Sequence, residues 1–321
     1  EEIVADTLMY RVPGHSITVM NGSFREVTDW SDHQGFVLAT FSKDKLYVFD
    51  SAKEEGELHL FPSREFRPTK SEYLVEAEIF KQNMEDLHIE KAVFSRIKEI
   101  PFQKNPQQLF FRLVEWYPEA LVYLLSSPFF GTWIGATPEI LISTIGSDAT
   151  TMALAGTLPS TDEGTWNKKE LEEQSFVRDY IRDTLKDAAI TDFKEEMRTE
   201  YLAGPVKHLV SHFHFKIEPQ QVSALALQLH PTPAVSGLPQ KEALKLILES
   251  EKHNRSLYAG VIGFLGAEEN QLYVNLRCAR LEEGAMHLYL GGGFTSDSIL
   301  EKEWEETENK ARTLLNVVDG I

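Results

Sequence analysis

The stretch AGVIGFLGAEENQLYVNLRCARLEEGAMHLYLGGGFTSDSILEKEWEETENKARTLLNVV (residues 259–318) contains a series of predicted β-strands followed by a predicted helix. Apolar residues dominate 259–265, 272–281 and 287–290, and turns rich in Gly and Glu separate these three predicted strands. Further along, core-type side chains recur at intervals of three or four: Leu300, Trp304, Thr307, Ala311, Leu314 and Val318. This spacing predicts one helix with a single face against the core.

The same mixture of short strands and long helices extends toward the N-terminus. Apolar runs predict further strands at residues 36–40, 46–49, 132–136, 140–144 and 151–158, and helical spacing predicts helices at 166–187 and 241–249. The segment 51–70 is charged, carries two prolines and is predicted to be a loop. Hairpins mixed with long helices are typical of an α+β fold rather than of a doubly wound parallel sheet.

The composition is typical of a globular cytoplasmic protein. Of the 321 residues, 42% are hydrophobic and 11% aromatic, which is enough to build a sizeable core. No apolar run approaches the roughly 20 residues that a membrane span requires, and residues 1–10 lack the basic start and apolar core of a signal peptide. Cys278 is the only cysteine, which excludes an internal disulfide and a Cys-rich zinc site.

The net charge of −18 limits the classes of partner. Nucleic-acid binding requires a basic face, so this balance argues against it. An anionic substrate would also be repelled, unless the site supplies cations of its own. Metal ions and a few placed Arg or Lys residues are the expected means.

Two predicted helices carry carboxylates that suit a hard cation. Mg²⁺ is held by one or two carboxylates together with waters and substrate oxygens, and Glu172 or Glu173 together with Glu303 or Glu306 fits that pattern. Lys169 with Glu173 and Glu306 with Lys310 are also i,i+4 pairs, as on any solvated helix face. Spacing alone leaves both interpretations open.

Four other polar residues stand where two interpretations compete. Lys91 opens a short apolar run, where an exposed strand-end lysine is the ordinary interpretation. Arg277 lies inside a predicted strand, so it either occupies a solvated face or faces a ligand. Glu139 follows a proline in a tight turn, and His230 begins a Pro-rich loop. The ordinary interpretation of Glu139 is a polar loop residue, and that of His230 is a structural hydrogen bond.

Nine short segments, taken in order, resemble the chorismate-utilising enzymes, which comprise isochorismate, salicylate, anthranilate and aminodeoxychorismate synthases. The segments are KAVFSR (91–96), GATPEILI (135–142), ALAGTLP (153–159), KKELEEQSFV (168–177), LHPTPAVSGLP (229–239), RSLYAGVIGF (255–264), LRCARL (276–281), GGGF (291–294) and EWEETENKA (303–311). The resemblance covers residues 85–318, and LHPTPAVSG is especially similar to the isochorismate synthase form. It implies one catalytic domain over residues 1–321, in which two packed β-sheets have helices outside and residues 1–70 are a variable β-rich part.

The resemblance also implies a role for each matching residue. Lys91 matches the general base that activates water, and Glu139 matches the general acid that protonates the departing hydroxyl. Glu173 and Glu306 match Mg²⁺ ligands, with Glu303 close by and acting through water. The residues that match substrate-contacting positions are His230, Tyr258, Arg277, Gly292, Gly293 and Lys310. Chorismate carries two carboxylates, so Mg²⁺ and these cations would offset the repulsion expected from the net charge.

Two positions distinguish members of this family. Relatives that make aminodeoxychorismate resemble one another in having a nucleophilic lysine just before the Gly-Thr of the ALAGT segment, where this chain has Ala155. Anthranilate synthases resemble one another in replacing the base lysine, which this chain keeps as Lys91. Isochorismate synthase is therefore the expected activity. Salicylate synthase, which also eliminates pyruvate, and a chorismate-binding protein without turnover are the alternatives.

The same resemblance sets the expected partners. We expect the chain to act on chorismate as a monomer or weak dimer, with no nucleic acid or membrane involved. No glutaminase subunit is expected, because water rather than ammonia is the nucleophile. The expected use of the product is menaquinone synthesis, its general metabolic role, with a siderophore as the other destination.

Overall fold

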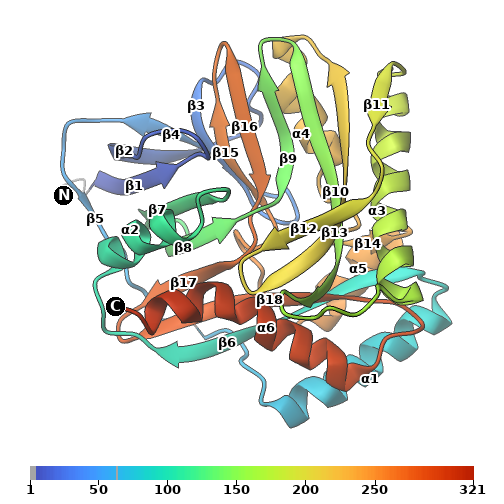
Figure 1. Ribbon diagram of the computed structural model, residues 1–321. Helices are drawn as coiled ribbons and strands as arrows, with labels where there is room; N and C mark the ends of the chain where they lie inside the picture. Colours follow the sequence, from blue (N-terminus) through green and yellow to red (C-terminus); the bar gives the residue numbers. More distant parts are fainter. Residues whose placement is uncertain (1–4, 63) are drawn as a thin grey trace.

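The strands join into one hydrogen-bonded ladder that folds back on itself, with the helices outside it (Figure 1). The computed structural model describes residues 5–62 and 64–321, and these contribute 18 strands to the ladder. Residues 1–4, in the predicted N-terminal part, and residue 63, in the predicted loop 51–70, lie outside the described residues.

The ladder has two halves joined by one strand. The first half runs in the order β14 (Gly237–Leu238), β6 (Lys91–Pro101), β18 (Ala285–Phe294), β17 (Cys278–Glu282), β8 (Gly131–Thr137), β7 (Leu121–Ser127) and β1 (Ala5–Arg11). The second half runs in the order β4 (Leu46–Ser51), β3 (Gly35–Ala39), β15 (Val261–Leu265), β16 (Glu269–Val274), β9 (Ile140–Ile145), β10 (Asp148–Pro159) and β13 (Val206–Lys216). The joining strand β2 (Thr18–Val27) pairs with both β1 and β4.

Three short strands complete the ladder. Both β11 (Phe193–Glu195) and β12 (Thr199–Ala203) pair with β13. Strand β5 (Gly56–Glu57) pairs with β1 in the one parallel pairing found within residues 5–62 and 64–321. The prediction of two packed sheets is confirmed, with the difference that hydrogen bonds connect the two layers into one ladder.

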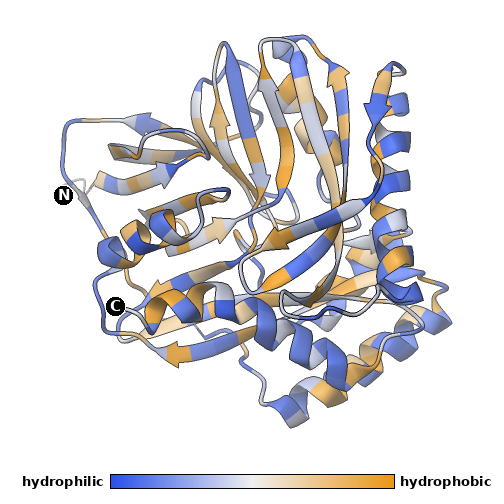
Figure 2. Ribbon diagram, viewed as in Figure 1, coloured by the Kyte–Doolittle hydropathy of each residue, from blue (hydrophilic) through white to orange (hydrophobic). Residues whose placement is uncertain are grey.

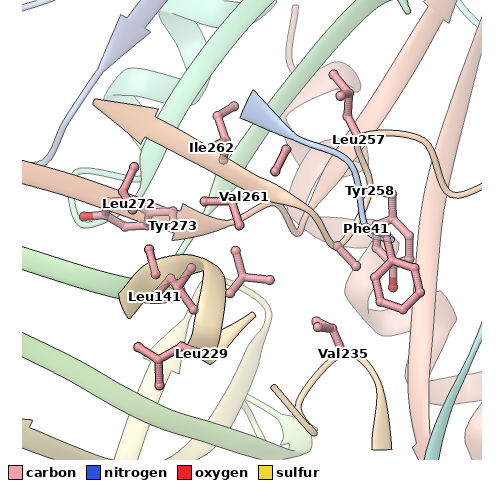
Figure 3. Close-up of a cluster of buried hydrophobic side chains, with 14 of the residues drawn as sticks. Phe41, Leu141, Leu229, Val235, Leu257, Tyr258, Val261, Ile262, Leu272 and Tyr273 are labelled. Carbon is pink, nitrogen blue, oxygen red and sulfur yellow. The ribbon is translucent and has the colours of Figure 1, made fainter. Parts of the chain in front are cut away.

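The main core lies between the two halves. It contains Trp133 and Tyr289 from the first half and Phe213 from the second. Val235 and Tyr258 belong to the same cluster, part of which Figure 3 shows. Since both layers contribute their inner faces, this core holds the two halves together.

A second core covers the outer face of the first half. Along β7, Tyr123 enters the main core, whereas its neighbours Val122 and Leu124 enter the second cluster. Successive side chains on a strand point to opposite faces, so a strand covered on both faces is apolar throughout rather than alternating. This explains the continuous apolar run at residues 121–125 of β7.

Six helices in the described residues pack around the ladder (Figure 1). The first half is covered by α1 (Lys70–Asp86), α2 (Pro106–Trp116), α5 (Gln240–Ser250) and α6 (Leu300–Val318), and the second by α3 (Lys168–Asp187) and α4 (Val222–Leu229). Helices α1, α3 and α6 mix hydrophilic and hydrophobic residues, as Figure 2 shows. The predicted buried stripe of α6 is confirmed, because Thr307, Ala311, Leu314 and Val318 are buried.

No helix within residues 5–62 and 64–321 has the length and apolarity needed to cross a membrane.

The prediction of a single strand over residues 272–281 is wrong. Strand β16 ends at Val274 in the second half, and β17 begins at Cys278 in the first half. Between them Arg277 has a φ of 50°, in the left-handed region that non-glycine residues rarely adopt. The amide of Asn275 stabilises this crossing, since it accepts from Tyr123 Oη at 2.6 Å and donates to Leu257 O at 2.9 Å.

Replacing Phe80 with alanine tests the packing of α1 on the first half. Its buried ring lies 4.7 Å from the Phe94 ring and 5.6 Å from the Phe294 ring. We expect Phe80→Ala to lower the free energy of unfolding by about 3–5 kcal/mol in urea titrations, because a cavity remains. Phe111→Ala on α2 is the matched control. Its side chain is 45% exposed, so the loss should stay below about 1 kcal/mol. Equal losses would contradict this packing.

Candidate active site

The glycine run 291–293 at the end of β18 is the centre of the candidate site. A Cβ on Gly293 would lie 2.1 Å from Glu173 Oε1, and a Cβ on Gly292 would lie 3.0 Å from Glu303 Oε2. Neighbouring positions on a strand face opposite ways, so the run has carboxylates from α3 on one side and from α6 on the other. Because glycine has no side chain, both helices can bring their carboxylates close to the strand.

A cavity beside this run contains most of the residues predicted from the sequence. Those that line it are Glu139, Glu173, Tyr258, Arg277, Gly293 and Lys310. Ala155 also lines it, so a methyl group stands at the position where aminodeoxychorismate-forming relatives are expected to carry a lysine. The site therefore lies between the two halves of the ladder.

Lys91 lies directly behind this lining. Its side chain is completely buried, and its Nζ is 3.2 Å from Glu173 Oε1. The interpretation of Lys91 as an exposed strand-end lysine is wrong, because Leu238 of β14 pairs beside it. Burial lowers the pKa of Lys91, against the opposing effect of the Glu173 carboxylate. A buried lysine of this kind is suited to act as a base.

Glu139 is held in the turn between β8 and β9. The Val274 N–H donates to Glu139 O at 2.9 Å, and the Thr137 hydroxyl donates to Val274 O, so the turn is tied to β16. The side chain is 3% exposed. Burial raises the pKa of Glu139 to about 8, more than the nearby cations Lys91, Arg277 and Lys310 lower it. Glu139 therefore keeps its proton at neutral pH, as a general acid must.

Three carboxylates and three ammonium groups meet where α3 and α6 approach β18. Besides the pair of Lys91 with Glu173, Lys169 Nζ lies 3.0 Å from Glu303 Oε1 and 3.6 Å from Glu173 Oε2. Lys310 Nζ lies 2.6 Å from Glu306 Oε1. The interpretation of these i,i+4 pairs as a solvated helix face is wrong, because the side chains are 3–13% exposed.

The charges in this cluster shift one another's pKa values. Burial alone would raise the pKa of Glu173, but Lys91, Lys169 and Lys310 together lower it to about 2. Burial raises the pKa of Glu303 to about 7, with Lys169 opposing the shift and Glu306 adding to it. The pKa of Lys169 is held well above its ordinary value, since Glu173 and Glu303 outweigh its burial. The cluster is therefore nearly neutral as a whole.

The carboxylates in this cluster fit a hard divalent cation in their chemistry. They supply oxygen ligands from two helices, which is the donor type that Mg²⁺ prefers. The buried Glu303 Oε2 has no hydrogen-bond partner, so one oxygen remains available to a cation. Within residues 5–62 and 64–321, no three His, Cys, Asp or Glu side chains are already arranged as a metal site. In this structure Lys91, Lys169 and Lys310 pair with the carboxylates instead.

His208 is a buried site residue that sequence reasoning missed. It lines the cavity, and Arg277 Nη2 donates to its Nε2 at 2.8 Å. Its Nδ1 donates to Gly156 O at 2.8 Å, which leaves Nε2 as the acceptor. Burial and the charges of Arg277 and Lys310 lower the pKa of His208 to about 3, so it stays neutral. Its place in the alternating strand 206–216 gave no sign of a functional site, because only the fold brings His208 next to Arg277.

Two predicted substrate-contacting residues do not line the cavity. The buried His230 turns away from it, and its Nε2 donates to Phe41 O at 2.9 Å. The ordinary interpretation, a structural hydrogen bond, therefore describes its position. Gly292 faces Glu303 and Glu306 of α6, because it has the opposite orientation to Gly293 on the strand.

The sequence matches the family model described as "Chorismate binding enzyme" over residues 4–319. The chain therefore belongs to the chorismate-binding enzyme family. The expectation drawn from the nine segments is confirmed at this level.

Relatives and solved structures agree with this assignment. The chain is 28% identical to the isochorismate synthase EntC of Escherichia coli K12 over 71% of its length and 62% of the relative's. It is 32% identical to the isochorismate synthase DhbC of Bacillus subtilis over 58% of its length and 50% of the relative's. The chain thus spans between half and two thirds of these relatives.

Two solved structures share the fold. One is a putative 2,3-dihydroxybenzoate-specific isochorismate synthase from Bacillus anthracis (TM-score 0.83, 22% identity, 98% of this chain and 96% of that chain). The other is the menaquinone-specific isochorismate synthase of Escherichia coli (TM-score 0.80, 22% identity, 98% and 89%).

The buried Glu139 predicts a pH-dependent difference in stability. Its folded-state pKa is about 8 against an ordinary value of 4.5. Its contribution to the free energy of unfolding is therefore complete below pH 4.5 and is lost as the pH rises through 8. The amide introduced by Glu139→Gln resembles the protonated carboxyl and does not titrate. Between pH 5 and 8.5 we expect wild type to lose about 2–4 kcal/mol of unfolding free energy relative to this variant. Urea titrations at pH 5, 7 and 8.5 measure the difference, and a constant difference would contradict the burial argument.

Proposed function

We propose that this protein is an isochorismate synthase, which converts chorismate into isochorismate with the help of Mg²⁺. The observation that carries the proposal is the arrangement of Lys91 and Glu139. Glu139 is a buried, protonated carboxyl that lines the cavity between the two layers, and Lys91 is a buried amine directly behind that lining. Arg277 and Lys310 in the lining supply positive charge for a substrate with two carboxylates.

The proposed reaction needs a base and an acid that act together. Lys91 removes a proton from the water that attacks ring carbon C2. The two ring double bonds then shift, and the bond between C4 and its hydroxyl oxygen breaks. Glu139 donates its proton to that oxygen, which leaves as water. One water enters and one leaves, so the product is an isomer of the substrate. Proton exchange with solvent resets both groups.

In this proposal Arg277 holds the substrate and His208 positions Arg277. Arg277 binds a carboxylate, and neutral His208 accepts a hydrogen bond from its guanidinium, which fixes the orientation of the guanidinium. Glu173 and Glu306 would hold Mg²⁺, with Glu303 acting through water. When bound, the ion would neutralise negative charge on the substrate's other carboxylate.

Product analysis tests the proposed activity. Purified protein is incubated with chorismate and Mg²⁺, without ammonia or a glutaminase, and the products are separated by chromatography. Isochorismate as the product supports the proposal. Salicylate and pyruvate as the only products would identify a salicylate synthase, and binding without turnover would identify a chorismate-binding protein.

The cellular use of the product is a further part of the proposal. We assign it to menaquinone synthesis, as expected from its general metabolic role, rather than to a siderophore. Loss of menaquinone in cells lacking this protein would support the assignment, and normal menaquinone with loss of a siderophore would overturn it.

Replacing the proposed base tests the division of labour. We expect Lys91→Ala to lower kcat by about 10²–10⁴, the usual contribution of a general base, while near-UV circular dichroism shows an intact fold. Lys168→Ala is the control, because that side chain is 78% exposed on α3, the helix that carries Glu173, and should leave kcat unchanged. A wild-type rate in Lys91→Ala would remove Lys91 from the mechanism.

Removal of metal tests the proposed role of Mg²⁺. We expect EDTA to abolish turnover and excess Mg²⁺ to restore it in wild type. In Glu306→Gln, the Mg²⁺ concentration for half-maximal rate should rise by at least about tenfold, because a carboxylate ligand is lost. Full activity in EDTA would contradict the proposed metal dependence.

A further inference from the structure

Lys169 has no role in the proposed chemistry, although it lies inside the charged cluster. Lys91 is the proposed base and Lys310 a proposed substrate contact. Lys169 instead contacts a carboxylate from each of two helices, Glu173 of α3 at 3.6 Å and Glu303 of α6 at 3.0 Å. Its side chain is only 12% exposed. No other described lysine forms ion pairs with both helices within this cluster.

A cation that bridges α3 and α6 would compete with the Lys169 ammonium group for the same carboxylates. Its ammonium group neutralises carboxylates that would otherwise repel each other across the gap between the helices. Glu303 uses only Oε1 for this contact, and its buried Oε2 has no partner. A divalent cation that engaged these carboxylates would have to displace the ammonium or lie beside it, at an electrostatic cost either way.

We infer that Lys169 is an internal counter-cation that weakens metal binding in the absence of substrate, so that metal and anionic substrate bind together. The inference rests on the proposed Mg²⁺ role of Glu173 and Glu306. A substrate carboxylate adds negative charge to the cluster and offsets the repulsion between Lys169 and the metal. Because binding linkage is reciprocal, the metal strengthens substrate binding by the same factor.

Metal titration without turnover tests this directly. Mn²⁺ is titrated into metal-free protein and the free ion is measured by electron paramagnetic resonance. We expect Lys169→Met to bind Mn²⁺ at least about tenfold more tightly than wild type, since one nearby positive charge is removed. Chorismate, brought to equilibrium by the enzyme, should tighten Mn²⁺ binding strongly in wild type and less in the variant.

Lys168→Met is the matched control. It removes the same charge one residue away on α3, from a side chain that is 78% exposed and pairs with Glu172. Its Mn²⁺ affinity should stay within about twofold of wild type, because solvent and salt screen an exposed charge. A tenfold change in both variants would indicate a general effect of net charge and overturn the inference.

Thermal unfolding gives a second readout that does not depend on activity. Without metal, Lys169→Met should melt at a lower temperature than wild type, since its carboxylates lack a counter-charge. Mg²⁺ should raise the melting temperature of the variant more than that of wild type. Lys169→Gln, which keeps a hydrogen-bond donor, serves if Lys169→Met does not fold.

The outcomes separate this inference from the proposed function. If wild type binds Mn²⁺ and both Lys169 variants bind it equally well, the role of Lys169 is overturned and the metal site stands. If wild type binds no Mn²⁺ with or without chorismate, the proposed metal dependence fails, and the inference fails with it.

Discussion

The burial of opposite charges beside a strand of glycines is the constraint on which the site depends. Glu173, Glu303 and Glu306 are taken out of water together with Lys91, Lys169 and Lys310. An isolated buried charge is very unfavourable, so each group needs a partner within a few ångströms. The carboxylates come from two helices, so α3 and α6 must both be held against β18. The lack of side chains at residues 291–293 makes that approach possible.

The crossing of the chain between the two layers completes the site. Strand β16 belongs to one layer and β17 to the other, and Arg277 lies at the crossing with left-handed backbone. From there its guanidinium reaches both the cavity and His208 of β13, in the second half of the ladder. The proposed substrate-binding cation thus sits where the fold changes layer, which is why its position depends on the whole ladder.

The sequence predicted much of the fold and part of the site, and the failures have physical causes. The helix carrying Glu303, Glu306 and Lys310 was predictable because its buried stripe has regular spacing. The break at Arg277 was not, since an apolar run has the same appearance whether it continues or crosses between layers. His208 was missed, and His230 was expected at the cavity but lies outside its lining, for one reason. Whether a histidine faces a cavity or a backbone carbonyl depends on packing partners distant in the chain.

The sequence by itself determined the α+β class, the family and the identity of the chemical groups, because these depend on residue order and local spacing. The tertiary structure alone decided which of those groups are buried and which are paired. Lys169 and Glu173 illustrate the difference. An i,i+4 pair has the same spacing on a solvated helix face as in a closed cluster. The pKa values of the pair, and the competition with a metal ion proposed for Lys169, depend on Glu303 and Lys91, which only folding brings near.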